Sequence, residues 1–232
     1  MSSISVTRLP LPVFRFVAVG VLLLAAGCRT PVATPPPTTP TVATLQAPAA
    51  DPGVASADVA ELFAVFAADS KSESFEKVRA ALVACADYDP YSTDLDDIVE
   101  LVEQEKFDEA KTALAKPPQN LLLSPRFHWQ AAVIADKTGS ADEAVVEFKK
   151  QQACLTGILS TGNGTEERPY LVTRVDDEYD LLRHLNKQMT RQSLRHRNER
   201  SFDVIDTADG QEIWFDITDV FATLAKKLGA GK

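Results

Sequence analysis

Apolar residues recur every three or four positions from Val59 to Leu159, which places them on one face of successive α-helices. Polar stretches and prolines interrupt this pattern at intervals that suit helices of ordinary length. Helices are expected around the inward-facing positions 59–66, 75–82, 98–102, 107–114, 127–135 and 144–148. The pattern therefore predicts that the first part of the folded chain is helical.

Capping residues mark several helix ends. A Ser-x-x-Glu pattern occurs at 70–73 and at 140–143, and in such a capping box the two side chains satisfy free backbone N–H groups of the first turn. Ser124 before Pro125 is an N-cap followed by proline at the first helical position. Gly139 suits a helix C-terminus, because glycine readily adopts positive φ.

After Leu159 the apolar spacing changes to the two-residue period of β-strands. The pattern predicts strands at 169–175, 190–196, 202–206 and 212–217 and short helices at 177–185 and 218–228. We therefore expect an α+β fold, in which a small mixed domain over 160–232 has a roughly four-stranded, mainly antiparallel sheet. About 70 residues are near the lower limit for an independent core, so this domain should pack against the helices.

Two similar hexapeptides, Glu105–Ala110 and Gly139–Ala144, lie 34 residues apart, which is the period of the tetratricopeptide repeat. In this register the alanines that close the hexapeptides occupy the position where paired helices approach closely. Leu114 and Phe148 occupy the large apolar position four residues later. The chain resembles the tetratricopeptide repeat family, which implies helical hairpins over 56–159. A bundle of hairpins with the same spacing by accident is the alternative.

Several short strings follow one another in a specific order. They are Phe75-Glu-Lys-Val-Arg79, Tyr88-Asp-Pro-Tyr-Ser92, Thr161-Gly-Asn-Gly-Thr165, Pro169-Tyr-Leu-Val172, Asp177-Glu-Tyr179, Gln192-Ser-Leu194, Phe202-Asp203 and Ile213-Trp-Phe-Asp216. Over 72–228 the chain is similar to bacterial exported proteins grouped as domain of unknown function 4919. The resemblance implies a helical part followed by a small α+β part, and it implies no activity. Asn163 stands where that family usually has an acid, which weakens a cation-binding role for this loop.

The N-terminal pattern is that of an export signal. Arg8 and Arg15 precede the apolar run Phe16–Ala26, which is too short to span a bilayer and suits the central region of a signal peptide. Small residues then lead to Cys28. We expect a lipoprotein signal peptide over 1–27 and a lipidated Cys28, whose acyl chains attach the protein to the membrane. A plain secretory signal or a membrane anchor is the alternative.

Residues 28–55 have the composition of a disordered linker. Seven of the chain's 14 prolines lie between Thr30 and Pro52, and such a segment favours extended polyproline conformations and buries no core. Arg29, rather than an aspartate, follows the cysteine and gives no signal for retention in the inner membrane. We therefore expect an outer-membrane lipoprotein that faces the periplasm.

The net charge limits which partners the chain can bind, and the cysteines raise the question of a disulfide. The chain carries 24 Lys and Arg against 33 Asp and Glu, a net charge of −9, and a surface of this sign repels nucleic acid. Export would place Cys85 and Cys154 where thiols can oxidise to a disulfide. Two buried small hydrophobic residues are the alternative, which the repeat register favours because it sets the cysteines nearly two repeats apart.

Candidate binding residues occur in both parts of the chain. His128 and Trp129 are candidates for lining a groove between repeat helices, although a histidine there can also serve as a packing partner of a neighbouring hairpin. The loop of Gly162, Asn163 and Gly164 can cradle an anion if its backbone N–H groups converge. A helix-to-strand connection that needs positive φ explains the same glycines.

Glu178 is a further candidate, because His184 and Asp216 lie in the same half of the chain. None of the HExxH, GxSxG or CxxC motifs accompanies them, so no catalytic residue, metal site or cofactor is assigned.

Basic residues are concentrated between Arg183 and Arg200. On a strand Arg191, Arg195 and Arg197 share a face, because successive side chains alternate. They either contact an acidic protein or anionic glycan, or they form a solvated face or one that docks on acids of the helical part such as Glu103, Glu105 and Asp108. The second interpretation is favoured.

The features together predict an envelope lipoprotein that serves as a protein- or peptide-binding scaffold, since repeat helices form concave grooves for extended or helical partners. An envelope hydrolase and a ligand-sensing domain, each with a site in the α+β half, are the alternatives.

Overall fold

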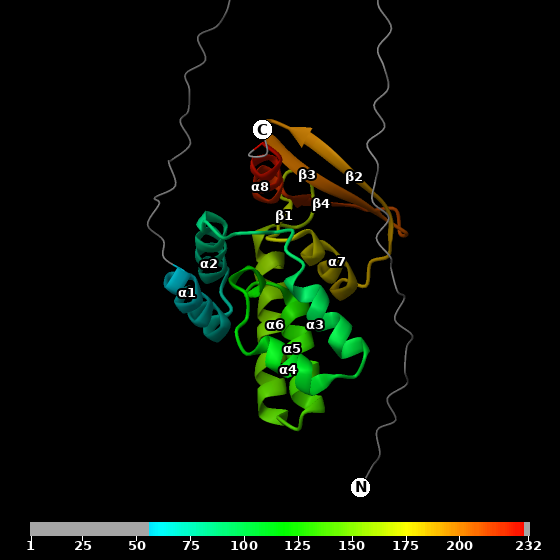
Figure 1. Ribbon diagram of the computed structural model, residues 1–232. Coiled ribbons are helices and arrows are strands. Elements are labelled where there is room, and N and C mark those ends of the chain that lie inside the picture. The colour runs from blue at the N-terminus through cyan, green and yellow to red at the C-terminus, as the bar shows by residue number, and fades with distance from the viewer. Residues whose placement is uncertain (1–55, 230–232) are drawn as a thin grey trace, which may run out of the picture. The chain divides into compact units, whose positions relative to one another are not determined.

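Helices build the first part of the region that the computed structural model describes, residues 56–229, and a four-stranded sheet with two further helices builds the second part (Figure 1). The predicted signal peptide, Cys28 and the predicted linker lie outside the described residues. The expected α+β class is confirmed.

Helical hairpins form the first part. Its elements are α1 (Ser56–Asp69), α2 (Ser72–Ala84), α3 (Asp94–Glu103), α4 (Phe107–Leu114), the 3-10 turn η1 (Gln119–Leu121), α5 (Pro125–Lys137) and α6 (Ala141–Thr161). The hairpin of α5 and α6 is central, with α1 and α2 packed against α6 and with α3 and α4 packed against α5 (Figure 1). Among residues 56–229 no helix combines the length and apolar character needed to cross a membrane.

Local capping explains some of the helix ends. Ser124 Oγ accepts a hydrogen bond from the Phe127 backbone N–H (3.3 Å), and Gly139 has a φ of +82°, as expected from the sequence. The capping box expected at 70–73 is wrong, because α2 begins at Ser72 without a side-chain cap, after a turn in which the Asp69 carboxylate accepts from the Lys71 backbone N–H (3.0 Å). Ser140 does precede α6, but its side chain makes no cap hydrogen bond, so the box expected at 140–143 is not formed.

The 34-residue register relates α4 to α6 in part. Ala110 is fully buried where α4 packs against its neighbours, as the register predicts for a close helix contact. Phe148 does not occupy the expected buried position, because 45% of its surface is exposed. In addition, α6 continues to Thr161 and is much longer than α4. The resemblance to tetratricopeptide repeats stays a prediction.

The sheet has the strand order β1-β4-β3-β2. Strand β1 (Tyr170–Leu171) pairs with β4 (Glu212–Asp216) in parallel, while β2 (Met189–Arg197), β3 (Arg200–Thr207) and β4 are antiparallel neighbours. The expected mainly antiparallel sheet is thus observed, except that β1 is much shorter than the strand expected at 169–175.

The start of α7 (Val175–His184) explains why β1 is short. The buried Asp177 carboxylate accepts hydrogen bonds from the backbone N–H groups of Thr173 (3.2 Å) and Arg174 (3.0 Å). These bonds satisfy two donors at the helix N-terminus, so the chain turns into a helix instead of continuing as a strand.

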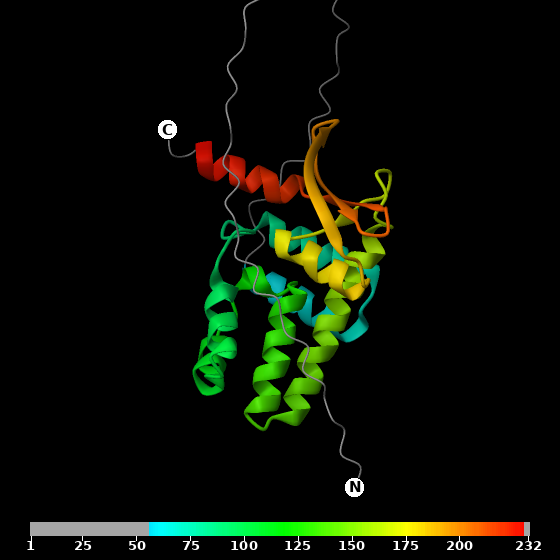
Figure 2. The same cartoon turned by 90° about the vertical axis from the view of Figure 1, so that its right-hand side faces the viewer.

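One apolar core connects the helices with the sheet, and residues 56–229 belong to one compact unit. The core runs from Val59 and Phe66 of α1 to Val220 of α8 (Thr218–Gly229). On the sheet it involves the inner face, defined by Ile205 and Phe215, against which α7 and α8 both pack (Figure 2). The boundary expected at 160 falls within this core, in the last turn of α6.

Cys85 and Cys154 form no disulfide with each other. Cys154 is a free, fully buried thiol, and its Sγ lies 3.9 Å from the carbonyl oxygen of Leu122. Cys85 is partly buried, and its Sγ lies 3.2 Å from the carbonyl oxygen of Ala81. The two thiols are not bonded to each other, so the interpretation of Cys154 as a small buried hydrophobic residue is confirmed.

Candidate functional site

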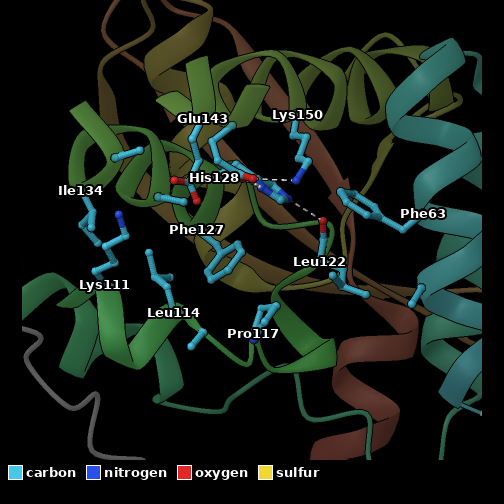
Figure 3. A pocket seen from close by; sticks show the side chains of 15 residues that line it. Phe63, Lys111, Leu114, Pro117, Leu122, Phe127, His128, Ile134, Glu143 and Lys150 are labelled. Atoms are coloured by element: carbon cyan, nitrogen blue, oxygen red, sulfur yellow. Dashed lines mark hydrogen bonds and ion pairs between the residues drawn. The ribbon is translucent and has the colours of Figure 1, made fainter. Parts of the chain in front are cut away.

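A pocket of about 490 Å³ opens in the helical part between α1, α4, α5 and α6. Figure 3 shows Phe63 reaching in from α1, Lys111 and Leu114 from α4, and His128 near the centre. Most of the lining is apolar: Ala60, Phe63, Leu114, Ala115, Pro117, Leu122, Phe127, Ala131, Ile134 and Ala135. Four charged side chains complete it: Lys111, Glu143, Glu147 and Lys150.

His128 forms a fixed part of the pocket wall. Its ring stacks on Phe63 with a centroid distance of 5.3 Å and an interplanar angle of 3°, and only 2% of the residue is exposed. Nε2 lies 2.9 Å from the carbonyl oxygen of Leu122, and Nδ1 lies 2.7 Å from Oε2 of Glu147. Because a carbonyl oxygen can only accept, Nε2 donates to Leu122. The proton on the other side of the ring lies between His128 and Glu147.

Glu147 connects His128 with the rim of the pocket. Its Oε1 accepts a hydrogen bond from Lys150 Nζ at 2.6 Å. Partial burial raises the pKa of Glu147, but hydrogen bonds from His128 and Lys150 outweigh burial and leave the pKa below its usual value. The Glu147 carboxylate is therefore ionised at neutral pH and holds both partners in place.

Lys111 closes the opposite end of the pocket. Its Nζ donates to the hydroxyl oxygens of Thr138 (3.3 Å) and Ser140 (3.2 Å), which flank the turn between α5 and α6. Besides His128, the lining carries two lysines and two glutamates, and the charges of these four side chains balance one another. Shape and the apolar lining, more than net charge, determine which ligands can enter.

The sequence pattern predicted that His128 lines a groove, but it did not indicate Glu147 as the partner of this histidine. The two residues are 19 positions apart, on helices that fold back on each other at Gly139. An antiparallel pairing about this glycine would have brought the glutamate opposite the histidine. The contributions of α1 and α4 to the pocket had no local signal, because they depend on how the hairpins pack.

Trp129 does not line the pocket, although it follows His128 in the sequence. Successive residues of an α-helix point about 100° apart, and Trp129 lies on another face of α5. Its ring is 6.4 Å from that of Phe148, and 48% of Trp129 is exposed. The two candidate residues of the helical part therefore belong to different surfaces.

The glycine loop is held together by its own backbone. The N–H groups of Asn163 and Gly164 both donate to the carbonyl oxygen of Arg168, at 2.9 and 3.1 Å. Gly164 has a φ of +74°, and a Cβ atom on Gly162 would lie 2.3 Å from the Pro169 carbonyl oxygen. The two amides are thus occupied within the chain, and the glycines are explained by the connection between α6 and β1.

The three arginines of β2 share the outer face of the sheet, the side that carries Val204 and Trp214, as the strand period predicts. Arg191 pairs with Asp206 (2.6 Å), Arg195 pairs with Glu212 (2.6 Å) and Arg197 pairs with Glu166. Arg195 and Arg197 also lie over the Trp214 ring, with centroid distances of 4.8 and 5.6 Å. Docking on acids of the helical part is wrong, because the partners are on the sheet and the adjoining loop. The solvated face, the other form of this interpretation, agrees with the exposed side chains of Arg191 and Arg197.

Glu178 is fully buried on α7, and it does not come together with His184 and Asp216, the residues considered with it in the sequence. His184 is exposed at the end of α7. Oδ1 of Asp216 accepts the Thr218 backbone N–H (2.9 Å) and thereby caps α8. Glu178 instead contacts Gln192 and Asp203 on the inner face of the sheet. Within residues 56–229 no group of three or more His, Cys, Asp and Glu side chains is arranged to hold a metal ion.

One of the strings noted in the sequence, Tyr88–Ser92, is attached to the start of α7. Tyr88 donates its hydroxyl to the carbonyl oxygen of Thr173 (2.7 Å). The Arg174 guanidinium donates to the carbonyl oxygen (2.7 Å) and the hydroxyl (3.2 Å) of Ser92. These bonds fasten the loop between α2 and α3 to the N-terminus of α7, so this string has a structural explanation.

Comparisons with known proteins add no relative: no family model, no curated protein and no solved structure matches the chain.

Proposed function

We propose that the protein is a bacterial envelope lipoprotein whose helical part binds a peptide or a protein segment in the pocket between α1, α4, α5 and α6. The observation that carries the proposal is the pocket itself, with an apolar lining and a few polar groups in fixed positions. Its volume of about 490 Å³ lies within the range of pockets that bind ligands. The resemblance to exported proteins with a domain of unknown function 4919 supports the proposed location.

Hydrolysis is not part of the proposal. The residues that would serve it in the α+β half do not converge, since Glu178 is buried and His184 is exposed. The pocket in the helical part contains one histidine, and both ring nitrogens of His128 are engaged by Leu122 and Glu147. Binding is the role that this geometry supports.

Blocking the pocket should abolish binding without unfolding the protein. Ala60 and Ala115 line the pocket from α1 and from the end of α4, and both are exposed, so tryptophan can be placed there without entering the core. We expect Ala60→Trp and Ala115→Trp each to weaken binding of peptides with apolar side chains at least about tenfold, or ~1.4 kcal/mol. The measurement is affinity for peptides selected by the parent chain from a synthetic library.

The matched control for these variants is Ala80→Trp, an exposed alanine of α2 that does not line the pocket. It should bind like the parent. If the parent selects no peptide, or if the blocked variants bind as tightly as the control, the pocket is not the binding site.

The lipid anchor is tested separately. We expect Cys28→Ser to move the protein from the membrane fraction to the soluble fraction. In the proposal, Cys28 is the residue that carries the acyl chains, and serine has no thiol to attach them to. Circular dichroism of the released chain should match that of the parent. A Cys28→Ser chain that still floats with outer-membrane vesicles would contradict lipidation at this residue.

A further inference from the structure

Two carboxyl groups meet at one glutamine side chain between α7 and the sheet. Glu178 on α7 is fully buried, and Asp203 on β3 is 8% exposed. Glu178 Oε1 has no hydrogen-bond partner among the described residues. The Gln192 amide on β2 donates from Nε2 to Asp203 Oδ2 (2.8 Å) and lies 3.4 Å from Glu178 Oε2. Three elements are therefore joined at one point.

No cation balances these carboxyl groups among the ion pairs of residues 56–229. The arginines near α7 lie elsewhere: Arg126 and Arg183 bind Asp180, and Arg174 binds the loop that contains Ser92. Two buried carboxylates that contact the same amide repel each other, whereas a proton on one of them removes this repulsion and allows a hydrogen bond between the two groups.

The groups that surround the pair disfavour a second negative charge. Asp176 and Asp177 approach Glu178 along α7. Tyr179 of α7 donates its hydroxyl to the Gln192 side-chain oxygen (2.6 Å). Tyr91, from the loop between α2 and α3, lies near both carboxyl groups and contributes a neutral hydroxyl. Acids and neutral groups thus face the pair from α7, β2, β3 and this loop.

We propose that Glu178 and Asp203 share one proton and form a pH-sensitive clasp that holds α7 against β2 and β3. With the proton in place, the hydrogen bond between the carboxyl groups closes the contact. Loss of the proton to solvent leaves two carboxylates in buried contact, which repel each other. The clasp then opens, and α7 separates from the sheet at this end.

The direction of the pH dependence follows from burial. Burial and the neighbouring Asp203 raise the pKa of Glu178 well above its usual value, and burial also raises that of Asp203. The folded chain therefore keeps a proton that the unfolded chain releases near the ordinary glutamate pKa of ~4.3. Stability is greatest in acid and falls as the pH rises towards the folded pKa, by about tenfold in the folding constant per pH unit.

Asp177 also has a raised pKa, so its contribution to the pH dependence of stability must be separated from that of Glu178 and Asp203. Burial and the neighbouring Asp180 raise its pKa to about 7, while Arg174 and hydrogen bonds from Thr173 oppose this. Its contribution is present in the parent and in any variant that leaves it unchanged. The difference between a Glu178 variant and the parent therefore isolates the clasp.

The experiment compares the full-length parent with Glu178→Gln by urea unfolding between about pH 5 and about pH 9. Glutamine has nearly the same shape, carries no charge and can donate to Asp203 at every pH. Above pH ~4.3 the parent should lose stability relative to the variant. The ratio of their folding constants should change by about tenfold per pH unit, until the pH reaches the pKa of the pair in the folded chain. Asp206→Asn, which alters an exposed ion pair on the same strand, is the control and should follow the parent.

Two further measurements on the parent chain do not depend on a variant that folds. Infrared spectroscopy at neutral pH should show a larger carbonyl signal from protonated carboxyl groups than Asp177, whose pKa is about 7, can give by itself. Hydrogen exchange should show faster opening of α7 and β2 at alkaline pH, beyond the change seen in α5. Parallel pH profiles for the parent and Glu178→Gln, or a neutral-pH spectrum with no carbonyl signal beyond that of Asp177, would overturn the proposal.

Discussion

Gly157→Ala should destabilise the protein by about 1–3 kcal/mol or more, although alanine normally stabilises a helix relative to glycine by about 1 kcal/mol. Gly157 lies on α6 where α2 crosses it. A Cβ atom at this position would lie 2.2 Å from Cδ2 of Phe75, whose ring is buried against Phe66. The ring is 1% exposed and packed in the shared core, so the ring or one of the two helices must shift.

Urea unfolding of Gly157→Ala, Phe75→Leu and the double variant checks this result. The smaller leucine should relieve the contact, so the double variant should lose less stability than the sum of the single losses. A Gly157→Ala variant that is as stable as the parent, or additive losses in the double variant, would show that the crossing has room for a methyl group.

Arg174→Met should cost about 3–5 kcal/mol, which is the range for removing one partner from a buried charged network. Arg174 is 3% exposed, and its guanidinium binds Ser92 while lying 3.9 Å from Asp176. Without it, the loop between α2 and α3 loses its attachment to α7. The pKa of the buried Asp177 should then rise further, because Arg174 is a neighbouring charge that lowers it.

The control for this variant is Arg183→Met, because Arg183 also contacts an acid of α7 but its side chain is 70% exposed. Arg183 is largely solvated, and the buried Asp180 keeps its second partner Arg126, so this change should cost at most about 1 kcal/mol. Limited proteolysis should additionally cut Arg174→Met within 88–93 faster than the parent. Equal losses in the two variants would mean that the attachment of the loop does not depend on Arg174.

Features that depend on neighbouring residues were predictable from the sequence. The predictions of a helix start at Ser124 and of a helix end at Gly139 were correct, since a cap or a positive φ requires only a few adjacent residues. The shared face of the β2 arginines was correct for the same reason. The error at Ser70 shows the limit of such signals, because α2 starts two residues later, after a turn in which Asp69 accepts from the Lys71 backbone N–H.

The candidate site was predictable only in part. Helical spacing placed His128 towards a neighbouring helix, but the size of the pocket and the roles of Phe63, Lys111 and Glu147 depend on the packing of several hairpins. The partners of the arginines were missed because cross-strand register brings Asp206 and Glu212 beside them. Register is decided by the whole sheet and cannot be read from one strand.

The sequence by itself determined the order and type of the helices and strands, the mixed α+β class and the acidic charge, because these follow from periodicity, local caps and composition. Tertiary structure decided which side chains meet. It placed Glu178 against Asp203, Gly157 against Phe75, and His128 against Glu147. Such contacts join residues that are distant along the chain, and they form because one shared core fixes how the helices and the sheet pack.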